Sequence, residues 1–487
     1  MSRPLRVAML LFLGSLLLQS AWILTLPPFR GTDEFDHAYR AAAVADGQWR
    51  APRAPAVDGR GQLVIVPRSL VLAAHPVCAS YGYTGPANCS PVRDVGGGRV
   101  EVASAAASYN PLFYWVIGTA ARPFTGAHAL YAMRISAALL CALMVGLTGW
   151  VTTLWARSSW PLAALVAATT PVMVFSMSVA APNGLEMCAA LTVWMSLLGL
   201  HNRRGRDDHP QALLLAATIG AVVLTTLRSI GPLWVLLVVG AVLLSLGPRP
   251  VVALVRRRAT LAGACALVVL TVTVAGVLWT RSAGTNALEP VATTVPNRLT
   301  GTLAELPLWF LQGIAAFPGR LGAAPALVYV LVTMVLLTLV GAALLIARRG
   351  LRLAMLLIVV LAVAVPVAVT IPTIRTAGAI WQGRYGLPYF LGLSLLAGLA
   401  LDQGRPRDRR VVPVVGACWL ALLVAQVVGA LHVLSGELAR SPLAHSSAWL
   451  RPHPWMVTAL MSAGFLVWGA ACRASSPREP GSASVWT

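Results

Sequence analysis

The sequence predicts an all-α polytopic membrane protein with about 12 transmembrane helices. Of its 487 residues, 57% are hydrophobic and only 11% are charged, and apolar runs of about twenty residues recur along the chain. A run of that length crosses the hydrocarbon core of a bilayer as a helix. The net charge of +21 does not indicate a nucleic-acid partner, because the basic residues lie in short clusters between apolar runs, a pattern that orients membrane proteins.

The basic clusters favour one topology. The first apolar run resembles a signal peptide, but its core is long and no clear cleavage site follows, so it is predicted to remain as a transmembrane helix. If that helix leaves the cytoplasm, the clusters that begin at Arg203, Arg256 and Arg348 all lie inside. The predicted helices span residues 5–26, 128–156, 160–180, 184–200, 211–229, 232–247, 259–280, 325–347, 352–371, 386–402, 411–433 and 455–471.

These helices are expected to form one transmembrane domain, residues 1–472, followed by a disordered cytoplasmic tail at 473–487 that is rich in Ser, Pro and Gly. Residues 109–124 are apolar but short and bounded by prolines, so they are predicted to form a surface helix. A span there would turn the next basic clusters outward. The external loops are then residues 27–127, 281–324 and 372–385.

Two of the seven cysteines, Cys78 and Cys89, lie in the first external loop among Gly, Pro, Ser and Tyr residues. An extracytoplasmic loop permits a disulfide between them, and two unpaired thiols are the alternative. The other five cysteines lie in or beside apolar segments, where they are expected to pack as small apolar side chains.

The stretch Thr32–Arg40 places several ionisable side chains just after the first helix. If residues 33–46 form a helix, Asp33, Asp36, His37 and Arg40 fall within an arc of roughly 100°. This pattern predicts a short surface helix with a charged face turned to a cavity. The alternative is an ordinary interfacial helix with solvated charges.

Two further polar groups lie on the same predicted side. Glu186 follows Asn183 at the start of a helix, and Gln382, Arg384 and Tyr385 lie with Arg375 in the third loop. A carboxylate opposed by arginines near a membrane suits a reaction in which a hydroxyl attacks and a lipid phosphate leaves. Further candidates for binding the phosphate are Arg134, Arg228, Arg281 and Arg320.

Each group also has a purely structural interpretation. Asn183 is a natural N-cap and Glu186 suits the positive end of a helix dipole. Arg384 and Tyr385 beside Trp381 are typical of an interfacial belt. Asp33, Asp36 and His37 offer ligands for a divalent cation, but no second ligand cluster accompanies them, so no metal site is assigned and a divalent cation stays open as a cofactor. The sequence contains no Walker-type phosphate loop and no nucleophile elbow.

Four short motifs follow one another along the chain: Asp33-Glu34-Phe35-Asp36-His37-Ala38-Tyr39-Arg40-Ala41, Tyr109-Asn110-Pro111-Leu112-Phe113-Tyr114, Pro182-Asn183-Gly184-Leu185-Glu186 and Gln382-Gly383-Arg384-Tyr385. In this order they resemble the motifs of the DUF2142 family of bacterial membrane proteins, which is similar in plan to the GT-C glycosyltransferases. Phe35 stands where the family usually has a proline.

The resemblance implies a GT-C-like fold with two surface helices in the first external loop. It also implies that Asp33 is the general base and that Glu34 orients the acceptor. Arg384 and Arg375 would bind the donor phosphate, and Gln382 and Tyr385 would shape the sugar pocket. Asp36, His37, Arg40 and Glu186 are further candidates for substrate binding.

The leading hypothesis is therefore an inverting glycosyltransferase of a bacterial plasma membrane, with its active site on the extracytoplasmic side. It would transfer a sugar from a polyprenyl-phosphate-linked donor to a cell-envelope glycan, lipid or protein. One alternative is a carrier or flippase for a lipid-linked sugar. Another is a non-catalytic envelope-assembly subunit that keeps the fold. The acidic residues after the first helix favour the transferase, because a flippase needs no base at the membrane surface.

Overall fold

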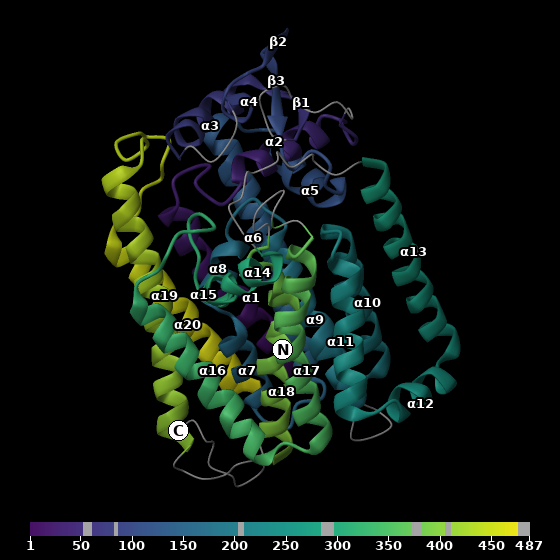
Figure 1. Cartoon of the computed structure of the whole chain (residues 1–487). Helices are drawn as coiled ribbons and strands as arrows, with labels where there is room; N and C mark the ends of the chain where they lie inside the picture. Colours follow the sequence, from purple (N-terminus) through teal and green to yellow (C-terminus); the bar gives the residue numbers. More distant parts are fainter. Residues whose placement is uncertain are drawn as a thin grey trace.

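The structure, a computed structural model, describes residues 1–51, 61–81, 86–202, 209–283, 297–372, 374, 381–404 and 411–475. Long helices form a bundle, and a layer of short helices and a small sheet covers one end of it (Figure 1). We call this end the sheet end. The opposite end carries α12 (Arg249–Arg257) and the connection between α16 and α17, both rich in arginine, and we call it the arginine end.

Ten helices in the described part of the chain are long and apolar enough to cross a membrane. They account for ten of the predicted spans, with ends that differ by a few residues in most cases. The ten are α1 (Arg3–Thr25), α6 (Gly126–Thr153), α9 (Asn183–His201), α10 (Pro210–Leu227), α13 (Ala259–Ala283), α16 (Ala326–Ile346), α17 (Arg349–Thr370), α18 (Leu387–Gly404) with the 3-10 turn η1 (Gly383–Gly386), α19 (Val411–Arg440) and α20 (Pro454–Ser475).

The other two predicted spans differ from this pattern. The helix expected at 160–180 is broken into α7 (Trp160–Ala168) and α8 (Pro171–Met177), which meet at 77° and make an eleventh span if they are counted together. Pro171 explains the break, because a proline disfavours helical backbone in the residue before it, and Thr170 is extended. The helix expected at 232–247 is α11 (Gly231–Leu246), which is shorter than the ten spans.

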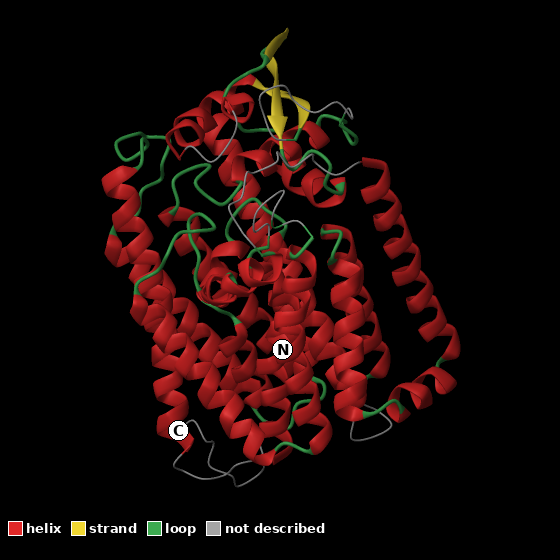
Figure 2. Cartoon of the chain, viewed as in Figure 1, coloured by secondary structure: helices red, strands yellow, loops and turns green. Residues whose placement is uncertain are grey.

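The first loop contains more structure than the sequence predicts. Helices are present at both positions where surface helices were predicted: α2 (Glu34–Ala45) and α5 (Pro111–Ala121). Between them lie α3 (Arg68–Tyr81), α4 (Pro86–Cys89) and an antiparallel sheet in the order β1-β3-β2 (Figure 2). The strands are β1 (Gln62–Pro67), β2 (Arg93–Gly96) and β3 (Arg99–Ser104).

Helices α2 and α5 pack closely because a glycine lies where they meet. A Cβ atom on Gly118 of α5 would come 2.1 Å from the carbonyl oxygen of Ala41 on α2, so only glycine fits. Asn110 caps α5 by accepting a hydrogen bond from the Leu112 amide at 3.1 Å, and Pro111 occupies the first turn. The Tyr109–Tyr114 motif thus begins a helix that fixes the position of α2.

Other differences from the predicted boundaries lie in the second loop and toward the C-terminus. The second loop, predicted at residues 281–324, contains α14 (Arg298–Ala304) and α15 (Leu306–Ile314). Helix α19 continues to Arg440, seven residues beyond its predicted end at 433. Residues 473–475 belong to α20 rather than to a tail. The remainder of the predicted tail lies outside the described residues.

Candidate functional site

Asp33 lies at the N-cap of α2, with left-handed backbone angles (φ 54°, ψ 21°) that are uncommon for a residue with a side chain. The helix was predicted to begin at 33, so the expectation that Asp33 shares a helical arc with Asp36, His37 and Arg40 is wrong. Its carboxylate is half-buried and forms no hydrogen bond or ion pair with any residue that the structure describes. Backbone strain of this kind concentrates at functional sites.

Glu34, the adjacent acid, is fully buried and paired with Arg134 of α6. Arg134 donates from Nε to Oε1 at 2.8 Å and from Nη2 to Oε2 at 2.6 Å, and it also donates to the carbonyl oxygens of Leu26 and Pro27. The amides of Gly31 and Ala180 donate to the same carboxylate. Every oxygen of Glu34 is therefore occupied inside the protein. This placement does not fit its predicted role of orienting an acceptor, nor that of Arg134 in binding phosphate.

Asp36 and Arg40 also make internal contacts rather than facing a cavity. Asp36 Oδ1 accepts hydrogen bonds from the Ala105 amide at 2.7 Å and the Asn88 side chain at 3.0 Å. Arg40 is buried and donates to the carbonyl oxygens of Gln48, Trp49 and Tyr109. These bonds tie α2 to α4, to the end of β3 and to the start of α5. These positions do not fit the predicted role of Asp36 and Arg40 in substrate binding.

His37 points to a group of tyrosines. Its Nδ1 lies 2.8 Å from the Tyr114 hydroxyl, and the two rings are stacked at 14°; Tyr109 packs against both rings. Burial lowers the pKa of His37 to about 4; the charge of Asp33 opposes this shift, and the charges of Arg228 and Arg384 add to it. His37 is thus neutral at pH 7 and lies within electrostatic reach of one carboxylate and two guanidinium groups.

Glu186 and Arg228 form a loose pair at the sheet end of α9 and α10. Arg228 Nη1 lies 3.8 Å from Glu186 Oε2, which is longer than a hydrogen bond, and the Arg228 guanidinium lies 4.1 Å from the centre of the Tyr385 ring. Glu186 is 1% exposed, and its Oε1 forms no hydrogen bond within the described residues. The pair leaves hydrogen-bonding capacity on both partners.

The Gln382–Tyr385 motif forms η1, which brings Arg384 to the same place. Gly383 donates its amide to Gln312 Oε1 at 2.8 Å, and a Cβ there would come 1.8 Å from the Trp309 carbonyl oxygen. Only glycine permits this approach, which fixes the direction of Arg384 next to it. The Arg384 guanidinium carbon lies 5.7 Å from the Tyr385 ring centre. Arg375 lies outside the described residues.

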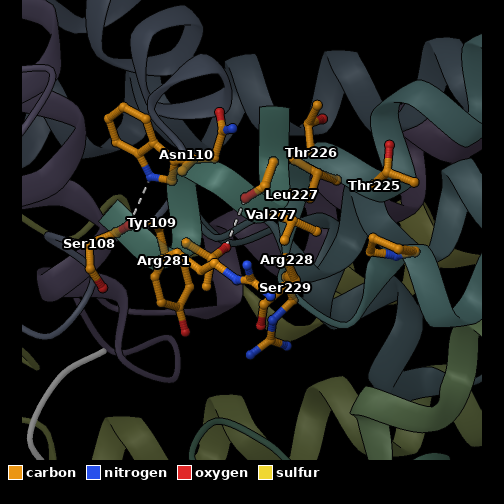
Figure 3. A pocket seen from close by; sticks show the side chains of 14 residues that line it. Ser108, Tyr109, Asn110, Thr225, Thr226, Leu227, Arg228, Ser229, Val277 and Arg281 are labelled. Carbon is orange, nitrogen blue, oxygen red and sulfur yellow. Dashed lines mark hydrogen bonds between the residues drawn. The ribbon is translucent and has the colours of Figure 1, made fainter. Parts of the chain in front are cut away.

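A cavity of about 420 Å³ opens beside Arg228, between α10, α13 and the segment that leads into α5, and we call it the arginine cavity. Figure 3 shows Tyr109, Asn110, Arg228 and Arg281 in its wall. One edge is closed by a hydrogen bond from Trp279 Nε1 to the Ser108 carbonyl oxygen at 3.0 Å. The lining residues are polar at the sheet end and include no acid: Ser108, Tyr109, Asn110, Thr225, Thr226, Leu227, Arg228, Ser229, Pro232, Gly276, Val277, Trp279, Thr280 and Arg281.

The structure thus brings Asp33, His37, Glu186, Arg228, Arg384 and Tyr385 to one region of the sheet end, with Tyr109 between Asp33 and the cavity. Arg281 also lines the cavity, whereas Arg320 is exposed.

Among the described residues, no group of three His, Cys, Asp or Glu side chains is placed to hold a metal ion. Cys78 and Cys89 are joined by a disulfide between α3 and α4.

Comparison with protein-family models gives a match to one described as "Predicted membrane protein (DUF2142)", over residues 16–396. The chain belongs to the DUF2142 family. Comparison of this DUF2142 protein with curated protein sequences gave no match. Among solved structures it is similar to ArnT from Cupriavidus metallidurans bound to undecaprenyl phosphate, with 16% identity and a TM-score of 0.46, over 93% of this chain and 75% of ArnT. The apo form of the same ArnT gives 17% identity and a TM-score of 0.44, over 93% and 74%.

Two residues of this site were not identified as site residues from the sequence. Tyr109 and Tyr114 belong to a quoted motif, but nothing in their spacing showed that their hydroxyl-bearing rings would face His37 and Arg228. His37 and Tyr114 are 77 residues apart in the sequence, and contacts at such separations leave no local periodicity. The available signal was Tyr109 itself, an aromatic residue with a hydroxyl placed directly before the N-cap residue Asn110.

Proposed function

We propose that this protein is an inverting glycosyltransferase that moves a sugar from a polyprenyl-phosphate donor to a cell-envelope acceptor on the extracytoplasmic face. The observation that supports this most directly is the environment of Asp33. Its carboxylate is half-buried and makes no hydrogen bond or ion pair among the described residues, yet it lies within electrostatic reach of His37, which two arginines also influence.

The Asp33 carboxylate has no hydrogen bond among the described residues, so it is able to accept a proton as a general base. As an acceptor hydroxyl attacks the anomeric carbon, its proton passes to the Asp33 carboxylate, and the bond between the sugar carbon and the phosphate oxygen breaks. The electron pair of that bond leaves on the phosphate. With a single carboxylate acting as base, attack comes from the face opposite the leaving group and inverts the anomeric centre. Neutral His37 contributes a hydrogen-bonding surface without competing for the proton.

The arginines suit the leaving phosphate. Arg228 and Arg281 both line the cavity, and Arg384 lies beside Tyr385, on whose ring Arg228 packs. Guanidinium groups bind phosphate oxygens with charge-assisted hydrogen bonds and stabilise the negative charge that grows as the phosphate leaves. In this proposal the donor phosphate occupies the cavity, and the sugar reaches past Tyr109 toward Asp33, with Gln382 and Tyr385 beside it.

The lipid chain of the donor has a route along α13. This helix is apolar and largely uncovered, and Leu267, Leu270 and Leu278 on it are each more than half exposed. Such a helix is surrounded by lipid in a bilayer. The cavity at its sheet end is therefore open to a headgroup whose chain stays among lipids. A water-soluble sugar nucleotide has no lipid chain that could lie along this apolar helix.

One observation favours the carrier alternative. Broken helices are typical of transporters, and α7 and α8 meet at 77°. The break lies at Thr169 and Thr170, and Thr170 donates a hydrogen bond from its hydroxyl to the Gly313 carbonyl oxygen at 3.1 Å. It is thus covered by α15 rather than lining the arginine cavity.

The test uses purified full-length protein in vesicles with a panel of polyprenyl-phosphate sugars and envelope acceptors. We expect donor consumption by the wild type and a loss of at least ~1,000-fold in kcat for Asp33→Asn, which keeps shape but cannot take a proton. Binding of the donor lipid should change little in this variant. If the wild type consumes no donor under any condition yet moves lipid-linked sugar across the vesicle, the transferase proposal is lost and the carrier is supported.

A further inference from the structure

A second polar cluster lies at the sheet end, apart from the arginine cavity. Arg30, in the segment between α1 and α2, donates from Nε to Oε1 of Glu437 at 2.7 Å, and the two side chains are 11% and 4% exposed. Tyr81, the last residue of α3, donates its hydroxyl to Oε2 of the same carboxylate at 2.8 Å. The Arg30 guanidinium lies 3.5 Å from the Tyr81 ring centre. We call these three residues the α19 clamp.

The clamp is well satisfied. Both carboxylate oxygens of Glu437 accept a hydrogen bond, one of them from a guanidinium that also stacks on an aromatic ring. Burial, followed by the nearby Glu437 carboxylate, raises the pKa of Tyr81, so its hydroxyl stays protonated and donates. Buried pairs with such complete hydrogen bonding hold their partners in one geometry.

The clamp holds the short segment that carries Asp33. Arg30 lies three residues before Asp33, and between them Thr32 donates a hydrogen bond to the Pro318 carbonyl oxygen at 2.9 Å. The other side of the segment is held by Glu34, which Arg134 fixes. Asp33 thus sits between two anchors, in a left-handed conformation that its own side chain does not stabilise.

The clamp also joins this segment to the disulfide. Tyr81 follows Cys78 by three residues on α3, and Cys78 is bonded to Cys89 on α4. His75 on the same helix lies 2.7 Å from the Cys89 carbonyl oxygen through its Nδ1. The disulfide therefore fixes the end of the helix that presents the Tyr81 hydroxyl to Glu437.

We propose that Glu437 is a positioning residue for Asp33, acting through Arg30 and supported by the disulfide-held Tyr81. This rests on the proposed transferase function, because its consequence for catalysis requires that Asp33 be the base. Glu437 lies on α19, far along the chain from Asp33, and its side-chain partners among the described residues, Arg30 and Tyr81, do not line the arginine cavity. The clamp sets where the carboxylate stands relative to the acceptor, and the arginine cavity separately sets where the phosphate stands.

The experiment compares Glu437→Gln with wild type in the transferase assay. We expect kcat to fall by about 100-fold while KM for the donor stays within about twofold, since a displacement of the base by about 1 Å affects the transition state and leaves phosphate binding intact. Tyr81→Phe, which keeps the stacked ring and removes one hydrogen bond, should give a smaller loss of kcat. Arg30→Lys, which keeps the charge, should retain more activity than Arg30→Met.

The matched control is Glu101→Gln, which breaks an exposed ion pair with Arg93 in the sheet and should leave kcat unchanged. If kcat in Glu437→Gln falls only in proportion to the folded fraction, or if KM rises as kcat stays constant, Glu437 is merely structural and the proposal is wrong.

A second measurement separates this proposal from the transferase proposal. Amide hydrogen exchange of residues 29–33 and 77–81 reports the clamp without any substrate. We expect faster exchange of both segments in Glu437→Gln, and in the Cys78→Ser, Cys89→Ser double variant, than in Glu101→Gln. If the wild type has no transferase activity but this exchange pattern appears, the clamp stands and the catalytic role of Asp33 fails. Unchanged exchange of residues 29–33 overturns the clamp.

Discussion

Two buried glutamates at the sheet end differ in how they are satisfied. Glu34 is 0% exposed and accepts hydrogen bonds on both oxygens from Arg134 and two backbone amides. Glu186 is 1% exposed, but its only charged partner within the ion-pair distance among the described residues is Arg228 at 3.8 Å, and its Oε1 has no hydrogen-bond partner there. Equal burial thus accompanies opposite degrees of satisfaction.

The difference indicates different roles. A buried charge with complete hydrogen bonding supports the folded structure, which makes it a frame residue. Its removal leaves the partner side chain buried without a counter-charge. A buried charge with unused capacity costs free energy in the resting protein, and such groups are retained where a ligand completes them. In the sequence, both acids follow a polar residue at the start of a helix, so only the structure distinguishes the frame residue from the candidate binding residue.

The largest expected effect comes from breaking the satisfied pair. Glu34→Gln leaves the Arg134 guanidinium buried without a counter-charge, and we expect it to lower the free energy of unfolding by about 3–5 kcal/mol. The loss should appear as a lower thermal unfolding temperature and a smaller yield of monodisperse protein in detergent. Equal stability of Glu34→Gln and Glu186→Gln would remove the distinction between the two acids.

The next effect concerns His37, which lies within electrostatic reach of Glu34 and Arg228. Its pKa is lowered to about 4, so the folded protein favours the neutral ring more than the unfolded chain does. Stability from this preference is fully present above about pH 6.5 and is lost as the pH falls toward 4, with an upper bound of about 3 kcal/mol. We expect His37→Gln to remove this part of the pH dependence of thermal unfolding. The same slope between pH 6.5 and 4 in both proteins would refute the buried neutral ring.

Much of the bundle is predictable because long apolar runs have few alternatives in a bilayer. The same reasoning does not apply to segments whose structure depends on polar side chains. Helix α19 continues past its apolar part to Arg440, and the sequence alone gave no reason to extend it as far as Glu437. The sheet was missed although Arg99–Val102 alternates between polar and apolar residues and Leu63–Val66 is rich in β-branched residues, because strands this short leave only a weak pattern among loop residues.

The site was predictable at the level of segments and not of side chains. Topology places Asp33, Glu186 and Arg384 at one end, and the structure brings all three to one region. Treating Asp33 as the first residue of a helix gave it the wrong neighbours, although aspartate is a favoured N-cap residue. The partners of Glu34, Asp36 and Arg40 lie on α6, directly after β3 and in the segment before α5, and no spacing within 33–40 shows them.

The smallest expected effect on folding, and the sharpest test of the comparison, comes from Glu186→Gln. We expect its stability to lie within about 1 kcal/mol of wild type, because the neutral amide is less costly to bury than a carboxylate with an unpaired oxygen, and Arg228 keeps its contact with the Tyr385 ring. Removing the carboxylate leaves Arg228 and Arg384 without a competing charge, so polyprenyl phosphate should bind about tenfold more tightly, which corresponds to about 1.4 kcal/mol. Titration with the lipid measures this, and Arg228→Met should shift the affinity in the opposite direction. If both variants bind the lipid as wild type does, the loose pair is a frame contact like that of Glu34, and the donor phosphate binds elsewhere.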